Sequence, residues 1–197
     1  KLSAYLSELV GRHRAKAEDN LLSRLANDTS PDRMEDLDLV VTGLLMLVAG
    51  HETTVNLIAN GTLTMLRYPH LLERLRSQPG IALHFVEELL RFEPPVQYLP
   101  NRVAAVDIDI GGTTIPKGSR IVLLLAAANR DPDLFVNPDV FDPDRPDNLH
   151  YGFSGGIHYC FGAPLARLEG QLALTAIARR LENPRLAVDP PPYRQSP

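Results

Sequence analysis

The feature that most constrains the fold is a long apolar stretch between two prolines, Pro31 and Pro69. Residues 37–66 are apolar at most positions, and a helix that is apolar on most sides is typically buried at the centre of a domain. Ser30 can cap such a helix, Pro31 suits its first position, and Pro69 ends it. The stretch therefore predicts one long, central, buried helix over residues 30–68.

The other elements follow from hydrophobic spacing and from turn residues. Residues 1–27 have helical spacing of their leucines, and prolines bound two short helices at 69–77 and 80–92. Alternation at 102–110, the Gly111-Gly112 pair and an apolar run at 119–125 predict paired strands. A further helix is expected at 164–181, after which the proline-rich tail 183–197 is strand or coil.

Residues 129–148 are crowded with proline and aspartate and predict a long coil. A coil of this length persists only if other parts of the chain hold it in place. Glu88 and Arg91 lie on one face of the helix predicted at 80–92, and Arg145 supplies a second guanidinium within the coil. On spacing alone, Glu88 and Arg91 are also compatible with an ordinary solvent-exposed pair.

Composition excludes several classes of protein. The chain has 197 residues, 44% of them hydrophobic, which is ordinary for a globular protein, and its net charge of −4 does not favour nucleic acid as a partner. The longest apolar run, residues 39–50, is interrupted by Thr42, so we expect no membrane anchor. A single cysteine and no secretory segment favour the cytoplasm. Because the chain does not begin with methionine, we expect it to be part of a longer protein.

The single cysteine, Cys160, lies in a glycine-rich segment just before a predicted helix start at Pro164. One thiol can form neither an internal disulfide nor a zinc cage by itself. A thiolate ahead of a helix N-terminus is stabilised by the positive end of the helix dipole, and Gly156 and Gly162 leave room for a flat ligand. The segment suits a thiolate that binds a metal ion already held by another group, such as haem iron.

A second unusual segment, residues 49–54, lies in the middle of the predicted long helix and reads Ala-Gly-His-Glu-Thr-Thr. The Thr53 hydroxyl can donate to the Ala49 carbonyl and open the helix, and Gly50 leaves space for a small ligand. A hydroxyl beside the Glu52 carboxylate can form a proton relay. A buried threonine that satisfies only its own hydrogen bond is the alternative interpretation.

Together these segments resemble the cytochrome P450 family. Phe153, Gly156, His158, Cys160 and Gly162 match the spacing of the family's cysteine loop, although Ser154 stands where glycine is often found. Residues 49–54 resemble the oxygen-activating motif of the family's central helix, and Glu88-Leu-Leu-Arg91 occurs in the family's order. The resemblance implies a mainly α-helical fold with a small β-sheet, incomplete here because the chain corresponds to the C-terminal half of that fold.

The resemblance also implies roles for individual residues. Cys160 would be the axial ligand of haem b, Thr53 would hold water or dioxygen, and Glu52 would feed protons from solvent. Arg102 and His158 would bind the haem propionates, and residues 96–99 would line the substrate pocket. The remaining implied haem contacts are Phe153, Gly162 and Ala49, and the implied buried structural triad is Glu88, Arg91 and Arg145.

The implied reaction is insertion of one oxygen atom from dioxygen into a small hydrophobic substrate, with electrons from a ferredoxin-type partner. The implied segments are helices before the central helix (1–29), the central oxygen-binding helix (30–68), two helices carrying Glu-x-x-Arg (69–101), a β-hairpin region (102–128), a meander coil (129–148), the cysteine loop with its helix (149–182) and a tail (183–197).

Three alternatives to a monooxygenase are a serine hydrolase, a zinc protease and a piece without activity. Gly152-Phe-Ser154-Gly-Gly156 matches the elbow of serine hydrolases, but no apolar strand precedes Ser154 and the only later histidine is His158. His51-Glu52 begins a zinc-protease signature whose second histidine position holds Val55. The third is a truncated, haem-poor piece that lacks activity by itself.

Overall fold

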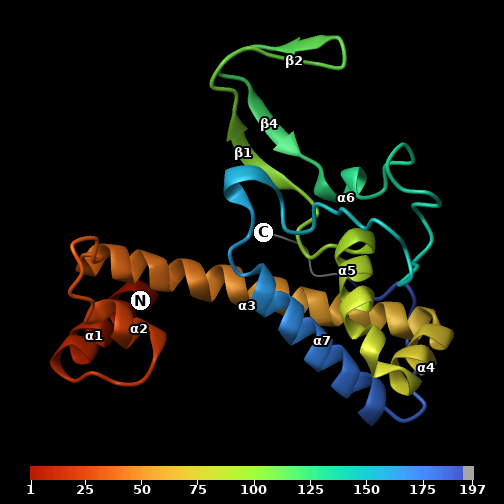
Figure 1. The fold of residues 1–197 in the computed structure, drawn as a ribbon, viewed down its shortest axis with the longest axis horizontal. Helices are drawn as coiled ribbons and strands as arrows, with labels where there is room; N and C mark the ends of the chain where they lie inside the picture. Colours follow the sequence, from red (N-terminus) through yellow and green to blue (C-terminus); the bar gives the residue numbers. More distant parts are fainter. Residues whose placement is uncertain (193–197) are drawn as a thin grey trace. The chain divides into compact units, whose positions relative to one another are not determined.

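The computed structural model describes residues 1–192 and is mainly α-helical with two small sheets (Figure 1), which confirms the expected fold class. The described chain divides into two compact units, Lys1–Glu52 and the part that begins at Thr53. The helices are α1 (Leu2–Ala15), α2 (Leu21–Ala26), α3 (Asp36–Arg67), α4 (Pro69–Ser77), the 3₁₀ turn η1 (Pro79–Ile81), α5 (Ala82–Phe92), α6 (Leu125–Ala128), the 3₁₀ turn η2 (Gly156–His158) and α7 (Ala163–Arg180).

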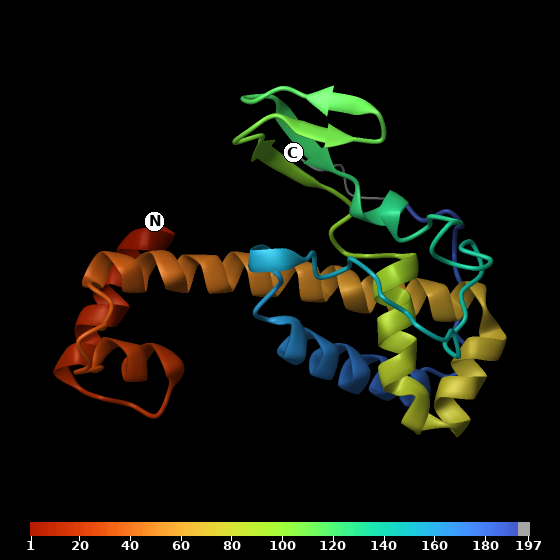
Figure 2. The ribbon, with the colours of Figure 1, turned by 45° about the horizontal axis from the view of Figure 1, so that its top comes forward.

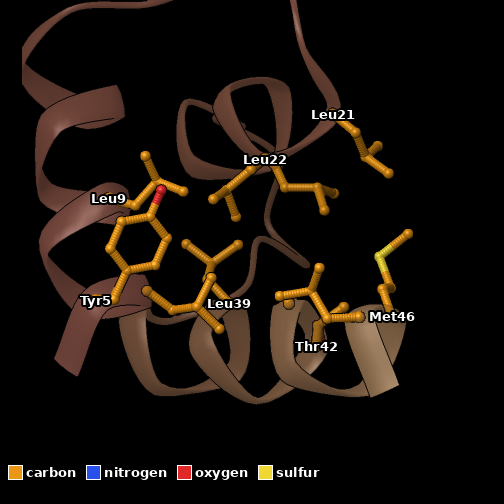
Figure 3. A pocket seen from close by; sticks show the side chains of 11 residues that line it. Tyr5, Leu9, Leu21, Leu22, Leu39, Thr42 and Met46 are labelled. Carbon is orange, nitrogen blue, oxygen red and sulfur yellow. The ribbon is translucent and has the colours of Figure 1, made fainter. Parts of the chain in front are cut away.

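The first unit holds α1, α2 and the N-terminal part of α3. Its buried apolar residues are Leu6, Val10, Ala26, Leu39 and Val40. Figure 3 shows leucines of all three helices, together with Tyr5, Thr42 and Met46, around an apolar cavity of about 340 Å³. The buried core of this unit is therefore small, and an open apolar pocket lies beside it.

Residues 1–27 are not helical throughout, although their leucine spacing indicated helix, because the chain breaks between α1 and α2. The Asn20 side chain accepts a hydrogen bond from the Ser23 amide at 2.9 Å and caps α2. The Ser23 hydroxyl in turn accepts from the Glu18 amide at 2.8 Å. These local bonds satisfy the backbone of the turn and favour a new helix start.

The start of the long helix was also predicted wrongly: α3 begins at Asp36, not at Ser30. The Asp28 carboxylate accepts hydrogen bonds from both the amide and the hydroxyl of Ser30, at 2.9 and 2.8 Å. Ser30 is therefore held in a turn and does not cap α3. The end was predicted correctly to within one residue, because Tyr68 is the N-cap of α4 and Pro69 is its first residue.

The expectation that α3 is buried on most sides is only partly met. Leu39, Val40, Leu57 and Met65 are buried, but several other apolar side chains are exposed, among them Val41, Leu45, Val48 and Val55. By length and composition alone α3 is able to cross a membrane, whereas no apolar run was expected to do so. Central helices of globular proteins meet the same criterion, so the observation is weak support for a membrane span.

The core of the second unit forms around α5. Phe85, Val86, Leu89 and Leu90 are buried and recur at helical spacing. A Cβ atom at Gly61 would lie 2.7 Å from the Leu174 methyl groups, so the C-terminal part of α3 approaches α7 closely. Two glutamates of α5, Glu87 and Glu88, contact the segments that follow β4: Glu87 contacts His150, and Glu88 accepts from the Asp142 amide.

Two antiparallel strand pairs complete the second unit (Figure 2): β1 (Leu99–Val103) pairs with β4 (Arg120–Leu123), and β2 (Ile108–Ile110) pairs with β3 (Thr113–Ile115). The hairpin at Gly111-Gly112 is confirmed. The prediction of one strand over 102–110 is wrong. The Ala104 amide donates to the Ser119 carbonyl, and the Ala104 carbonyl accepts from the Gly118 amide, in the turn before β4. This contact turns the chain out of the first ladder before β2 begins.

Two boundaries of the β-hairpin region differ slightly from the prediction. β1 begins at Leu99, inside the segment assigned to helices, and the strand predicted at 119–125 ends before Leu125, where α6 starts. Residues 129–148 form neither helix nor strand, as expected of the coil. Residues 183–192 also form neither, and the rest of the predicted tail, 193–197, lies outside the described residues.

Candidate functional site

Cys160 lies on an exposed loop between η2 and the N-terminus of α7. Its amide donates to the Phe153 carbonyl at 3.1 Å, and its carbonyl accepts from the Ala163 amide at 3.2 Å. Gly162 precedes α7, and a Cβ atom there would lie 3.7 Å from the Cys160 sulfur. The thiol is thus held at the positive end of an 18-residue helix, where a thiolate is stabilised.

Large apolar side chains are exposed next to this thiol. Ile157 is 97% exposed, Phe161 72% and Leu165 60%. A contiguous exposed apolar surface usually marks a binding site or an interface. An exposed sulfur bordered by such side chains is suited to a flat, apolar, metal-containing ligand.

Ser154 occupies a strained backbone position in the loop. Its φ angle is 62°, in the left-handed region that glycine adopts most readily. Its amide donates to the Tyr151 carbonyl at 2.8 Å, which closes the turn. This geometry explains why glycine is suited to the position and why a small polar residue is still accommodated.

Phe153 is a buried residue of the loop, and no local sequence pattern indicates which side chains support it. The guanidinium of Arg167, on the first turns of α7, lies 4.7 Å from the centre of the Phe153 ring. Arg167 also donates to the Tyr159 hydroxyl at 3.0 Å. Glu87 of α5 accepts two hydrogen bonds from Arg167, at 2.6 and 2.9 Å.

His150 is the fourth polar member of this cluster. Its Nδ1 accepts from the Gly152 amide at 3.0 Å, so its Nε2 carries the proton and donates to Glu87 at 3.1 Å. Burial alone would raise the pKa of the Glu87 carboxyl, but the hydrogen bonds from His150 and Arg167 lower it to about 2. The hydrogen bond to Glu87 raises the pKa of Arg167.

Glu88, Arg91 and Arg145 lie in direct contact. Glu88 and Arg91 are fully buried and form a bidentate pair with bonds of 2.8 and 2.7 Å. The Arg145 Nε atom lies 3.2 Å from Glu88 Oε1. The Glu88 carboxylate also accepts from the amide of Asp142 and the side chain of Asn148.

Both guanidinium groups use their remaining donors on carbonyls of the coil 129–148. Arg91 donates to the carbonyls of Asn129, Pro138 and Val140, and Arg145 to those of Val136, Asn137 and Val140. The Asn129 side chain, which sequence reasoning missed, is fully buried and accepts from the Tyr151 amide at 2.7 Å. These bonds satisfy a coil that has no ladder of its own.

The segment 49–54 is α-helical throughout, so the opened turn predicted from Thr53 is not seen. Thr62 and Thr64 of the same helix donate to carbonyls four residues earlier at 2.8 Å and leave the helix intact. A threonine bond of this kind is therefore accommodated in α3 without a break. Ala49 and Glu52 are exposed at the end of the first unit, and Thr53 is half-buried at the start of the second.

One contact of α3 with α7 lies next to Thr53, and His158 and Arg102 are the remaining predicted haem-binding residues. The hydroxyl of Thr54, next to Thr53, donates to Glu169 of α7 at 3.1 Å. His158 is exposed at the end of η2, two residues before Cys160. Arg102 is half-buried within β1, opposite Ile121 of β4, and is not at the strand start as expected.

Comparison with known proteins adds a family match to this geometry. The family model described as Cytochrome P450 matches residues 82–194, more than half of the chain. The biotin biosynthesis cytochrome P450 of Bacillus subtilis is 44% identical over 93% of this chain and 46% of its own length. The vitamin D(3) 25-hydroxylase of Pseudonocardia autotrophica is 44% identical over 100% of this chain and 50% of its own length.

Solved structures show the same relation. The bacillaene polyketide synthase cytochrome P450 PksS of Bacillus subtilis superimposes with a TM-score of 0.90 and 40% identity, over 95% of this chain and 49% of that one. The chain thus spans about half the length of the relatives that it matches.

Proposed function

Because this chain belongs to the cytochrome P450 family, we propose that it supplies the cysteine-loop half of a haem-thiolate monooxygenase. The proposed reaction inserts one oxygen atom from dioxygen into a small hydrophobic substrate. The observation that carries this proposal is the exposed Cys160 thiol at the N-terminus of α7, bordered by exposed apolar side chains.

The residues of the loop fit haem. The sulfur is a single soft donor at the positive end of a helix, and the exposed Ile157 and Phe161 supply an apolar surface for a macrocycle. We propose that Cys160 is the axial ligand of haem b and that Phe153, Gly162 and Ala49 contact the same group. When bound, haem supplies dioxygen activation with electrons from a redox partner, and an axial thiolate favours O–O cleavage.

Arg102 and His158 are proposed as the partners of the haem propionates. Guanidinium groups bind carboxylates with two parallel hydrogen bonds, and an imidazole N–H can add a third donor. His158 is exposed only two residues from Cys160, which supports its assignment. The half-buried position of Arg102 in β1 is compatible with a charged head that reaches a carboxylate.

Thr53 and Glu52 are proposed to hold and deliver protons during the reaction. A hydroxyl can hold water or dioxygen by donating and accepting hydrogen bonds, and an exposed carboxylate can exchange protons with solvent. Glu52 is exposed and Thr53 is half-buried, as such a relay requires. The contact of Thr54 with Glu169 ties the helix to α7 beside this pair.

Glu88, Arg91 and Arg145 are proposed as structural residues, not catalytic ones. Their hydrogen bonds go to each other and to the coil, and Glu88 and Arg91 have no exposed surface. A clamp of this kind stabilises the coil that leads into the cysteine loop. The substrate is proposed only as small and hydrophobic, and the electron donor as a ferredoxin-type protein.

The test uses the complete protein that contains this chain. We expect its reduced carbon monoxide complex to show the strongly red-shifted Soret band of thiolate-ligated haem, and Cys160→Ser to abolish that band, because an alcohol does not provide a thiolate. Ser154→Ala is the matched control in the same loop, and we expect it to retain the band. An unchanged band in Cys160→Ser contradicts the proposal, and ester hydrolysis that depends on Ser154 supports a serine hydrolase instead.

The exposed apolar side chains of α3 favour a second proposal about the isolated piece. We propose that residues 1–197 by themselves bind haem weakly and do not turn over substrate, since half of the family's length is missing from them. Stoichiometric haem binding and hydroxylation by the isolated 197 residues would contradict this.

A further inference from the structure

We infer that Arg167, held by Glu87, is a positioning residue that fixes both ends of the cysteine loop and thereby the direction of the Cys160 sulfur. The inference rests on the proposed haem-thiolate function. It assigns to Arg167 and Glu87 a role that the family motifs in the sequence did not indicate.

The geometry of the pair is that of a rigid clamp. Arg167 meets the Glu87 carboxylate through Nε and Nη2, at 2.6 and 2.9 Å, which is the bidentate arrangement that fixes a guanidinium plane. Both side chains are largely shielded, with 28% and 22% of their surface exposed. The pair joins α5 to the first turns of α7 across 80 residues of sequence.

The same guanidinium touches both ends of the loop. Its Cζ atom lies over the Phe153 ring, at 4.7 Å from the ring centre, and its Nη1 donates to the Tyr159 hydroxyl at 3.0 Å. The rings of Phe153 and Tyr159 meet edge to face at 6.3 Å. Cys160 follows Tyr159 directly and donates its amide to the Phe153 carbonyl, so fixing these two rings fixes the backbone of Cys160.

Glu87 also holds the start of the loop through His150. The His150 ring donates to Glu87 at 3.1 Å and accepts from the Gly152 amide at 3.0 Å. A Cβ atom at Gly152 would lie 2.7 Å from the Leu90 carbonyl, so this part of the loop is pressed against α5. One carboxylate thus anchors the loop before Phe153 and, through Arg167, after it.

The cluster is separate from the clamp of the coil. Glu87 and Glu88 are adjacent on α5, but Glu88 contacts Arg91 and Arg145, whereas Glu87 contacts Arg167 and His150. Hydrogen bonds that orient a metal ligand from the next layer of residues commonly change affinity or activity by about 10-fold to 100-fold. Such effects differ from a general loss of stability because they alter the ligation itself.

The test compares Arg167→Lys with Arg74→Lys in the complete haem-loaded protein. Lysine keeps the charge but has neither the planar fork nor the stacking surface. Arg74 is the matched control, because it forms an equally bidentate pair with Asp144 at 2.6 Å and is similarly shielded, at 31% exposed, but does not contact the loop. Two readouts are measured, the Soret band of the reduced carbon monoxide complex and the rate of haem transfer to apomyoglobin.

We expect Arg167→Lys to lose part of the thiolate-shifted band and to release haem about 10-fold faster than the unsubstituted protein, while Arg74→Lys keeps both properties. Tyr159→Phe should move both readouts in the same direction by less, since the ring remains. Glu87→Gln combined with Arg167→Lys should be no worse than Glu87→Gln alone, because that variant already weakens the link to Arg167.

Two outcomes separate this inference from the function on which it rests. If the unsubstituted protein shows no thiolate-shifted band, the proposed function itself fails. If it shows the band and Arg167→Lys matches Arg74→Lys in both readouts, the function stands and the positioning role is wrong. Equal losses in the two lysine variants also contradict the positioning role, because they indicate a general loss of stability.

Discussion

Glu87 shows at the scale of one residue how the surroundings of a side chain set its protonation. Its carboxyl is partly buried, which favours the neutral form, yet bonds from Arg167 and His150 lower its pKa to about 2. A carboxyl whose pKa is lower in the folded state than in the unfolded state stabilises the fold above its unfolded pKa. That contribution disappears as the pH falls toward the folded value.

We therefore predict an acid-sensitive contribution from Glu87 between its ordinary pKa of 4.5 and about 2. The contribution is about 3 kcal/mol at neutral pH, of which about 2 kcal/mol is lost by pH 3. Urea unfolding of the complete protein and of Glu87→Gln at pH 7 and pH 3 measures it, and the difference in the free energy of unfolding should shrink at pH 3. A constant difference at the two pH values contradicts the prediction, and Glu73→Gln, an exposed glutamate, serves as the control.

Individual residues were predictable where chemistry is encoded by local spacing. Cys160, His158 and Gly162 could be selected within one short segment, and Glu88 and Arg91 are three residues apart on one helix. Glu87 and Arg167 are 80 residues apart, so no local pattern connects them. Ser154 could be identified as a departure from glycine, but only its φ angle of 62° shows that a non-glycine residue there adopts the left-handed region.

At the scale of elements, the coil 129–148 contains no helix or strand, so other hydrogen bonds must hold its backbone in place. Arg91 and Arg145 donate hydrogen bonds to its carbonyls, and the Glu88 carboxylate pairs with both guanidinium groups. A buried charge that loses its partner is strongly destabilising. The coil is therefore held by Glu88 and Arg91 of α5 together with its own Arg145.

We predict that Glu88→Ala and Arg91→Ala abolish haem incorporation in the complete protein, and that Glu88→Ala destabilises it by about 3 to 5 kcal/mol. Glu73→Ala is the control, because Glu73 pairs with Arg76 at the same spacing but is itself 67% exposed. For that pair we expect a change of at most about 1 kcal/mol. Haem content from the absorbance spectrum and urea unfolding provide the measurements, and normal haem content in both buried variants disproves the clamp.

Element boundaries were predictable where proline or paired glycine sets them. Pro69 and Pro94 bound α4 and α5, and Gly111-Gly112 forms the hairpin. The helix break before Leu21 and the strand break after Val103 depend on side chain and backbone bonds that spacing does not reveal, such as those of Asn20 and Ala104. The start of α3 was missed because Asp28, and not α3, uses the polar atoms of Ser30.

At the scale of the whole molecule, many large apolar side chains are exposed and belong to neither of the two buried cores. Val41, Leu45 and Val48 are exposed on α3, and Leu165, Leu168 and Leu172 lie three and four residues apart on α7. That spacing places the three leucines on one helix face. α3 was predicted as buried from its apolar composition, and the chain spans about half the length of the relatives that it matches.

We predict that this face of α7 is covered in the complete protein. Leu168 is 52% exposed here, whereas Leu174 on the same helix is 1% exposed. If a further part of the fold covers Leu168, Leu168→Ala should lower the free energy of unfolding of the complete protein by about 2 kcal/mol or more, approaching the effect of Leu174→Ala. If Leu168 stays in solvent, its truncation should change that free energy by about 0.5 kcal/mol at most. Urea unfolding of the two variants distinguishes these outcomes, and a small effect at Leu168 beside a large one at Leu174 shows that the exposed face belongs to the complete protein as well.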